Sequence, residues 1–204
     1  MENERETNYA QLLGTVEQTP VFSHKSYGEQ FYELKLAIKR RSGYDDVIPV
    51  VVSERLFWPG MPKCGERVAV CGQVRTYNKE EEGRNRLIIT VFAREYRAAE
   101  AAETYDENYI QLTGFLCKAP IQRTSPLGRE ICDLMVAVNR MYNKSDYIPC
   151  IAWGRNAGYG GKLQVGDSIS LTGRIQSREY KKRDAEGNAQ QRIAYEVSVL
   201  KIEG

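Results

Sequence analysis

The sequence carries one pattern twice. Residues 8–14 (NYAQLLG) recur as residues 108–114 (NYIQLTG), and Ile48-Pro49 recurs as Ile148-Pro149. Further matching pairs, at offsets of 100 to 106, are Pro20 and Pro120, Ala37 and Ala137, Gly65 and Gly166, and Arg86 and Arg192. Chance does not preserve a register this long, so the chain is a duplication of one domain.

The duplication sets the expected domain limits. We expect a first domain over residues 8–97, a linker over residues 98–107 and a second domain over residues 108–203. The linker contains the run AAEAAE at 98–103. Alanine and glutamate favour helix, so we expect the linker to have helical tendency.

Each copy contains five stretches in which apolar residues alternate with other residues, as in half-buried strands. In the second copy the apolar positions are Leu112/Gly114/Leu116, Leu134/Val136/Val138, Ile148/Cys150/Ala152, Ile169/Leu171/Gly173/Ile175 and Tyr195/Val197/Val199, and the first copy matches them. A longer stretch follows the third strand in each copy, at 53–64 and 154–165. We therefore predict an all-β chain of two tandem five-stranded OB-fold barrels. A β-sandwich is the alternative, although it usually needs about seven strands.

The sequence favours a binding protein over an enzyme. Its only histidine is His24, its five cysteines are scattered without a C-x-x-C pair, and no phosphate-binding GxxxxGK[ST] loop is present. We therefore expect no metal, no cofactor and no catalytic site. The glycine-rich stretch 158–161 is interpreted as a plain turn, and Asp45-Asp46 as solvated residues at a hairpin end.

Charge and hydropathy restrict the partners. Net charge is +2; residues 1–104 sum to −1 and residues 105–204 to +3, so the second copy is the better candidate for phosphate binding. No apolar run of about 18 residues occurs, so we expect no membrane span. The polar N-terminus lacks the apolar region of a secretory signal, which predicts a cytoplasmic protein.

One strand of the second copy carries a candidate stacking face. Tyr147 and Trp153 are six residues apart, so both project from one side of the strand with Pro149 and Ile151, opposite the Ile148/Cys150/Ala152 core face. Strand aromatics usually serve packing, but exposed aromatics on a barrel are also platforms on which bases stack. Cations interleave with them, so we predict a surface that binds single-stranded nucleic acid.

The candidate residues of the second copy extend beyond that strand. Tyr142 lies in the preceding hairpin and Tyr180 in the last hairpin. The basic candidates are Arg140, Lys144, Arg155, Arg174 and Arg178, with Lys181, Lys182 and Arg183 expected in a loop that reaches phosphates.

These residues carry a resemblance to a known family. The pattern comprises Leu112-x-Gly114, Pro120, Arg123, SPLG at 125–128, LMVAVNR at 134–140, Tyr147-x5-Trp153-Gly-Arg155 and GDSISLTGRI at 166–175. The second copy resembles the bacterial-type single-stranded DNA-binding protein family, in a tandem OB-fold version. The resemblance implies sequence-independent binding of single-stranded DNA in replication, recombination and repair. It implies Tyr142, Tyr147, Trp153 and Tyr180 as the base-stacking aromatics and adds Arg123 to the basic DNA-binding candidates.

The first copy departs from the family pattern. Ser42, Val47 and Ser53 stand where the second copy has Tyr142, Tyr147 and Trp153. Weaker candidates there are Tyr44 and Tyr77 in the two hairpins, with Lys39, Arg40 and Arg41 beside Tyr44; Phe57 and Trp58 are expected to pack in the core. The first copy is therefore expected to bind weakly or to serve the assembly.

The resemblance also implies partners. Family members usually assemble four OB folds, so two per chain predicts a homodimer, with replication proteins as possible further partners. The family usually has an acidic tail, and this sequence stops at KIEG (201–204), so recruitment through a tail is not expected. Two other functions stay open: a primosome-type accessory protein with weak single-strand binding, and an OB-fold nuclease.

Overall fold

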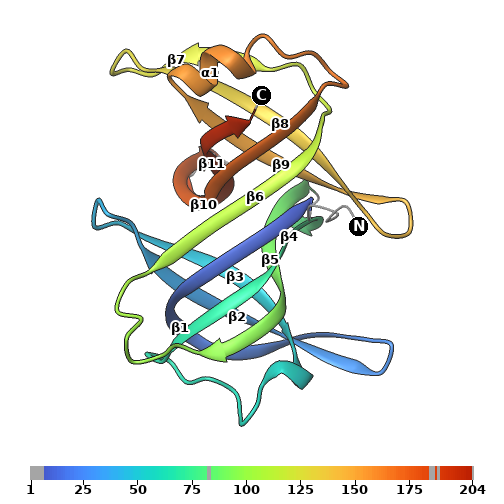
Figure 1. Cartoon of the computed structure of the whole chain (residues 1–204), viewed down its shortest axis with the longest axis vertical. Coiled ribbons are helices and arrows are strands. Elements are labelled where there is room, and N and C mark those ends of the chain that lie inside the picture. The colour runs from blue at the N-terminus through green and yellow to red at the C-terminus, as the bar shows by residue number, and fades with distance from the viewer. Residues whose placement is uncertain (1–6, 82–83, 184–186, 188, 204) are drawn as a thin grey trace.

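The computed structural model describes residues 7–81, 84–183, 187 and 189–203, and strands dominate this part of the chain (Figure 1). The first half comprises β1 (Asn8–Ser26), β2 (Glu29–Lys39), β3 (Asp45–Ser53), the 3₁₀ turn η1 (Glu54–Leu56), β4 (Arg67–Glu81) and β5 (Arg84–Ala98). The second half comprises β6 (Glu107–Leu116), β7 (Ile121–Thr124), β8 (Glu130–Arg140), β9 (Lys144–Trp153), helix α1 (Arg155–Gly160), β10 (Ser168–Arg183) and β11 (Ala189–Glu203). The predicted all-β class is confirmed.

In each half, the paired strands form a closed circuit. In the first half β1 pairs with both β2 and β4, β2 pairs with β3, β3 runs parallel to β5, and β5 pairs with β4. In the second half β6, β8, β9, β11 and β10 close in the same way, again with one parallel pair, β9 and β11. The short β7 pairs with β8 and replaces the second part of the longer β1. Each closed circuit contains five strands, and the buried hydrophobic residues of the two halves form one connected cluster.

Glycines allow the first strand of each half to cross its neighbour closely. A Cβ added at Gly14 would lie 2.5 Å from the Ala37 carbonyl oxygen, and one at Gly114 would meet the Ala137 carbonyl oxygen in the same way. Only glycine fits so near a backbone, and the close crossing lets β1 and β6 bend from one side of the circuit to the other.

The interior of each half is filled by the residues of the predicted core faces. Leu12, Leu34 and Ile48 in the first half, and Leu112 and Ile148 in the second, have no exposed surface. Tyrosine and phenylalanine close the end beside η1, where Phe57 makes edge contacts with Tyr32 and Tyr96 at ring-centroid distances of 6.1 and 5.3 Å. Burial raises the pKa of Tyr96 to about 12.

Some local expectations were wrong. Trp58 is 86% exposed rather than packed, because Phe57 takes the place beneath η1 with Tyr32 and Tyr96. Residues 99–106 contain turns and no helix; a helical run this short is marginal without packing support. The glycines at 158 and 160 lie within α1 rather than in a plain turn.

The two halves join through β1 and β6, which lie side by side in the middle of the molecule (Figure 1). Tyr9 is opposite Gln111, and Gln11 is opposite Tyr109. Tyr9 and Gln11 of the first copy are equivalent to Tyr109 and Gln111 of the second, so exchanging the copies turns one pair into the other. The register therefore has the symmetry of a two-fold interface. The duplicated sequence thus forms, within one chain, the kind of contact that two identical subunits form.

Buried carboxylates reinforce this contact, which corrects the expectation that Asp45-Asp46 is solvated. Asp45 is exposed, but Asp46 is only 1% exposed. Its carboxylate pairs with Arg40 at 2.6 Å and accepts a hydrogen bond from the Ser177 backbone N–H of the other half at 2.8 Å. A buried carboxylate needs such partners, and the packing of the second half supplies them.

Candidate nucleic-acid interface

Strand β9 presents the two aromatic side chains of the predicted platform. Tyr147 is 51% and Trp153 36% exposed, whereas Ile148, Cys150 and Ala152 of the opposite parity are buried. Pro149 is half-buried and Ile151 is buried, because β9 lies between β8 and β11 and Ile151 faces Ser198 across the parallel pair. The structure therefore places an aromatic at each end of this strand face, separated by an apolar floor.

The β8–β9 hairpin extends the platform toward the first half (Figure 1). Tyr142 at its tip is 87% exposed and has a φ of +63°, a backbone conformation typical of tight turns. Lys144 is also exposed. Arg140 is half-buried, with its Nη1 3.7 Å from the Asp146 carboxylate and its Nε buried without a hydrogen bond among the described residues. The hairpin thus carries an aromatic tip between two cations.

This hairpin forms one wall of a groove of about 840 Å³, called here the inter-half groove. The other wall is the outer face of β3, β4 and β5 with the β1–β2 hairpin. Its aromatic lining is His24, Tyr27, Tyr77, Phe92 and Tyr142, and its cationic lining is Arg75, Arg94, Arg140 and Lys144. The structure therefore brings Tyr77, a weak candidate of the first copy, together with three strong candidates of the second.

Sequence reasoning missed most of the first-half lining of the groove. Phe92 and Arg94 alternate along β5 with the buried Val91 and Ala93, so the same parity argument used for β9 would have found them. His24 and Tyr27 carry no comparable signal, because their place depends on how the β1–β2 hairpin packs. Tyr77 lies within β4, opposite Ile88, in the β4–β5 hairpin, as expected.

Arg75 is held at the groove by a carboxylate from the other half. Its Nη1 lies 3.2 Å from Asp146, which also faces Arg140. Burial lowers the pKa of Arg75, and the nearby Asp146 charge opposes that shift. Asp146 itself has no exposed surface. One buried carboxylate therefore fixes two groove arginines in place.

Arg178 and Tyr180 lie at a second cavity, of about 350 Å³, between the halves. The Arg178 guanidinium carbon is 6.0 Å from the Tyr180 ring centroid, and its Nε is 3.9 Å from Glu196. Arg86 from the first half and Arg192 from β11 also line this cavity. Lys181 to Arg183 continue β10 rather than forming a loop. The side chains of Lys181, Lys182 and Arg183 lie outside the described residues.

The remaining candidates of the second half stand apart from these cavities. Arg123 makes a two-point ion pair with Asp133 at 2.7 and 3.1 Å, so its charge is already partnered. Arg155 is exposed at the start of α1, next to Trp153 in the chain. Arg174 is half-buried, and its Nε makes no hydrogen bond among the described residues. Of these three, Arg155 is the best placed to accompany a base on Trp153.

The basic cluster of the first half lines a hollow of about 870 Å³. Lys39, Arg40 and Arg41 share that lining with Asp45 and Asp106. Arg40 is committed to Asp46, which raises the pKa of its guanidinium, and it also lies 4.7 Å from the ring centroid of the half-exposed Tyr44. Arg40 is therefore engaged within the protein, whereas Lys39 and Arg41 are exposed.

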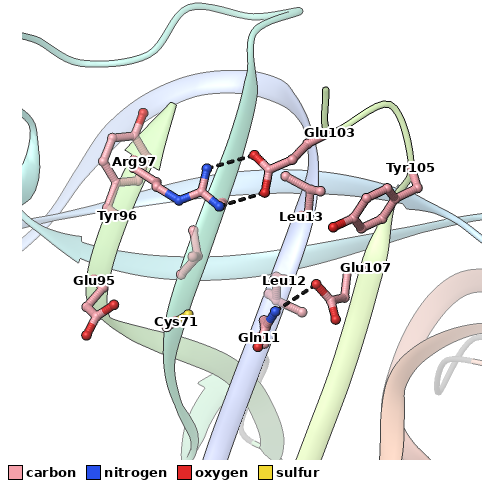
Figure 2. A pocket seen from close by; sticks show the side chains of 12 residues that line it. Gln11, Leu12, Leu13, Cys71, Glu95, Tyr96, Arg97, Glu103, Tyr105 and Glu107 are labelled. Carbon is pink, nitrogen blue, oxygen red and sulfur yellow. Dashed lines mark hydrogen bonds and ion pairs between the residues drawn. The ribbon is translucent and has the colours of Figure 1, made fainter. Parts of the chain in front are cut away.

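A smaller cavity, of about 200 Å³, lies under the segment that connects the halves and has an acidic lining (Figure 2). Glu95, Glu103 and Glu107 line it. Arg97 makes a two-point ion pair with Glu103 at 2.7 and 2.6 Å, which ties the segment to β5, and Gln11 donates to Glu107 at 2.8 Å (Figure 2). The carboxylates make this side of the molecule a poor surface for a polyanion.

A known protein family matches the second half of the chain. Residues 107–203 match the model of the single-strand binding protein family. The second half is therefore similar to members of that family. The resemblance drawn from the motifs of the second copy is thereby confirmed.

Curated relatives of this family match part of the chain. A single-stranded DNA-binding protein of Clostridium tetani is 32% identical over 84 residues, covering 38% of this chain and 58% of the relative. Single-stranded DNA-binding protein A of Bacillus subtilis is 30% identical over 86 residues, covering 39% of this chain and 50% of the relative. The matched segment thus spans between half and three-fifths of these relatives.

A solved structure matches both halves. The wild-type single-stranded DNA-binding protein of Thermus aquaticus superposes with a TM-score of 0.76, covering 96% of this chain and 91% of that one, at 22% identity. At this identity the similarity shows the fold alone, and it does so for 96% of this chain. Within the described residues we found no helix suited to crossing a membrane and no group of three or more metal-ligating side chains.

Proposed function

We propose that this protein binds single-stranded DNA without sequence preference and protects it during replication, recombination and repair. The observation that carries the proposal is the exposure of Tyr147 and Trp153 on one face of β9. Tyr142, Arg140 and Lys144 stand at one end of that face and Arg155 at the other. The family of the second half and the names of its relatives support the same ligand.

The chemistry needs no catalytic group. Each stacked base contributes about 1–3 kcal/mol, and stacking tolerates every base because each has a π-face. Lysine and arginine beside the aromatics neutralise phosphates and release their counterions, which makes the affinity depend on salt. We propose a binding role without catalysis, metal or cofactor.

The proposal extends to domains and assembly. Residues 8–97 and 108–203 act as two OB-fold domains joined by residues 98–107, and two chains pair as a homodimer with four OB folds. Replication proteins are the expected further partners. The place of action is DNA in the nucleoid of the cytoplasm. Light scattering of the free protein and of its complex with DNA tests the dimer.

Tryptophan fluorescence tests the ligand directly. The chain has two tryptophans, Trp58 and Trp153, so Trp58→Phe leaves Trp153 as the sole reporter. Oligo(dT), oligo(dA) and a mixed sequence should each quench this fluorescence, with affinities tighter than about micromolar at moderate salt. Absence of binding to all three would reject the proposal.

The same material separates the alternatives. A primosome-type accessory protein would bind these oligomers weakly and a replication protein tightly. A nuclease would shorten end-labelled oligo(dT) when a divalent metal is added. A single-stranded RNA of matched length decides between the two nucleic acids.

A further inference from the structure

We propose that the inter-half groove is a second tract for the same single strand, so that DNA passes from the β9 platform over the β8–β9 hairpin onto β4 and β5 of the first half. This inference rests on the proposed function and assigns it a site in the half that lacks the family's aromatics. The first half is then a working part of the binding surface.

Charge is segregated into this groove. Arg75, Arg94, Arg140 and Lys144 line it, and none of the described residues in its lining is aspartate or glutamate. The chain as a whole is nearly balanced, with a net charge of +2, and the cavity under the connecting segment is lined by three glutamates. Asp146 offsets part of the charge of Arg75 and Arg140 but is fully buried. What the groove presents to a ligand is therefore cationic, as a polyanion requires.

Aromatic rings form a row across the first-half wall. The His24 and Phe31 rings stack at 4.9 Å with an interplanar angle of 10°, and Phe31 meets Phe92 at 5.7 Å and 39°. These rings come from β1, β2 and β5. Tyr27 at the rim is fully exposed, and Tyr77 is about half-exposed. The His24 and Phe31 rings cover each other's inner faces, so the exposed rings of Tyr27 and Tyr77 are the ones on which bases can stack.

The strand register explains why the first copy lacks aromatic residues at the family positions and still presents them on the same surface. Trp153 is opposite Ile131, whereas its counterpart Ser53 is opposite Phe31. Directly opposed residues share one face of a sheet. Each half therefore has one aromatic in this cross-strand pair, on the third strand in the second half and on the second strand in the first half. Phe92 likewise stands opposite Val51, where the second half has Ser198 opposite Ile151.

The two tracts are contiguous. The backbone N–H of Tyr147 donates to Thr76 Oγ1 at 3.0 Å, so the platform strand touches β4 of the first half. Thr76 lies beside Tyr77 and lines the groove. The exposed ring of Tyr142 stands at the same groove, so a strand leaving Tyr147 reaches first-half aromatics without crossing an acidic surface.

Two variants of the full chain test the groove. Phe92→Ala removes a ring of the row. Tyr27→Asn removes a fully exposed ring and keeps a residue type that tolerates the φ of 47° at this turn, so it leaves the core untouched. Phe22→Ala is the matched control, because Phe22 is an exposed aromatic of the same half outside the groove lining. Thermal unfolding verifies that each variant is folded.

Affinity is measured for oligo(dT) of about 12 and about 30 nucleotides, the reach of one barrel and of two. Both groove variants should weaken binding of the long oligomer by about tenfold and leave binding of the short one close to wild type, with no change in Phe22→Ala. Ultraviolet crosslinking of a long bromodeoxyuridine oligomer should label first-half peptides that carry Tyr77 or Phe92.

The outcomes separate the inference from the function it rests on. If folded groove variants bind the long oligomer as tightly as wild type, and crosslinks fall only in the second half, the inference is wrong while binding by the platform stands. If the wild-type protein binds neither oligomer, both are wrong.

Discussion

Asp46 and Asp146 occupy equivalent positions in the two halves, and each accepts a backbone hydrogen bond from the other half. Asp46 Oδ1 accepts from the Ser177 N–H and Asp146 Oδ1 from the Thr76 N–H, both at 2.8 Å. Thr76 and Ser177 are themselves equivalent positions of the fourth strand of each copy. The exchange is reciprocal, as in an interface between two identical subunits, and it helps to set the relative position of the two proposed binding surfaces.

Removing one of these carboxylates should destabilise the protein strongly. Asp46→Ala leaves the Arg40 guanidinium and the Ser177 N–H without their partner, and breaking a buried ion pair costs about 3–5 kcal/mol. Urea unfolding measures the change. Asp45→Ala, next to it but exposed, should stay within about 0.5 kcal/mol of wild type. Equal stability of the two variants would show that the contact between the halves contributes little.

Trp153→Ala should lower the affinity for single-stranded DNA without unfolding the protein. The ring is partly exposed, and its loss removes one stacked base, worth about 1–3 kcal/mol. Fluorescence anisotropy with labelled oligo(dT) measures the loss. Trp58→Ala is the control, because Trp58 is more exposed and lies on neither binding tract. A folded Trp153→Ala protein with wild-type affinity would remove Trp153 from the platform.

Salt should weaken binding in proportion to the phosphates neutralised. The logarithm of affinity falls with the logarithm of salt concentration at a slope of about −0.7 for each phosphate. Lys144→Gln should make this slope shallower by about 0.7, because Lys144 is an exposed cation of the groove. Lys63→Gln, an exposed lysine outside the groove, should keep the wild-type slope. If the affinity of the wild-type protein does not change with salt concentration, the cationic path is rejected.

The connecting segment should stay attached to β5 in mild acid. Hydrogen bonding to Arg97 lowers the pKa of Glu103 from its ordinary value of 4.5 to about 2. Because the folded pKa is depressed, the stabilisation is complete above about 4.5 and is lost as pH falls toward about 2. Hydrogen exchange of residues 99–106 should therefore show protection that persists below pH 4.5. Glu103→Gln should lose this protection at neutral pH, whereas Glu100→Gln should keep it.

Local pattern was enough for much of the fold. Alternation located every strand of the two circuits except β7, and the parity of β9 correctly set Tyr147 and Trp153 apart from Ile148, Cys150 and Ala152. The alternation pattern succeeds because successive side chains of a strand point to opposite faces. A strand with one buried face therefore has apolar residues at every second position.

The same pattern could not say what lies beyond the outward face. Ile151 and Asp46 were expected to face solvent, and both are buried by strands that follow much later in the chain. Tyr77 and Tyr142 belong to different copies and meet at one groove only because β1 pairs with β6 in a symmetric register. The cost of burying a polar group depends on such distant partners.

The sequence by itself determined the duplication, the positions of the strands along the chain, the core faces and the aromatic face of β9, because each is encoded in the spacing of residues within or between the copies. Only the tertiary structure decided how the copies face each other, and with that which carboxylates are buried and which aromatic and cationic side chains share a groove. Those features arise from contacts between the copies, and the spacing of residues within one copy carries no information about them.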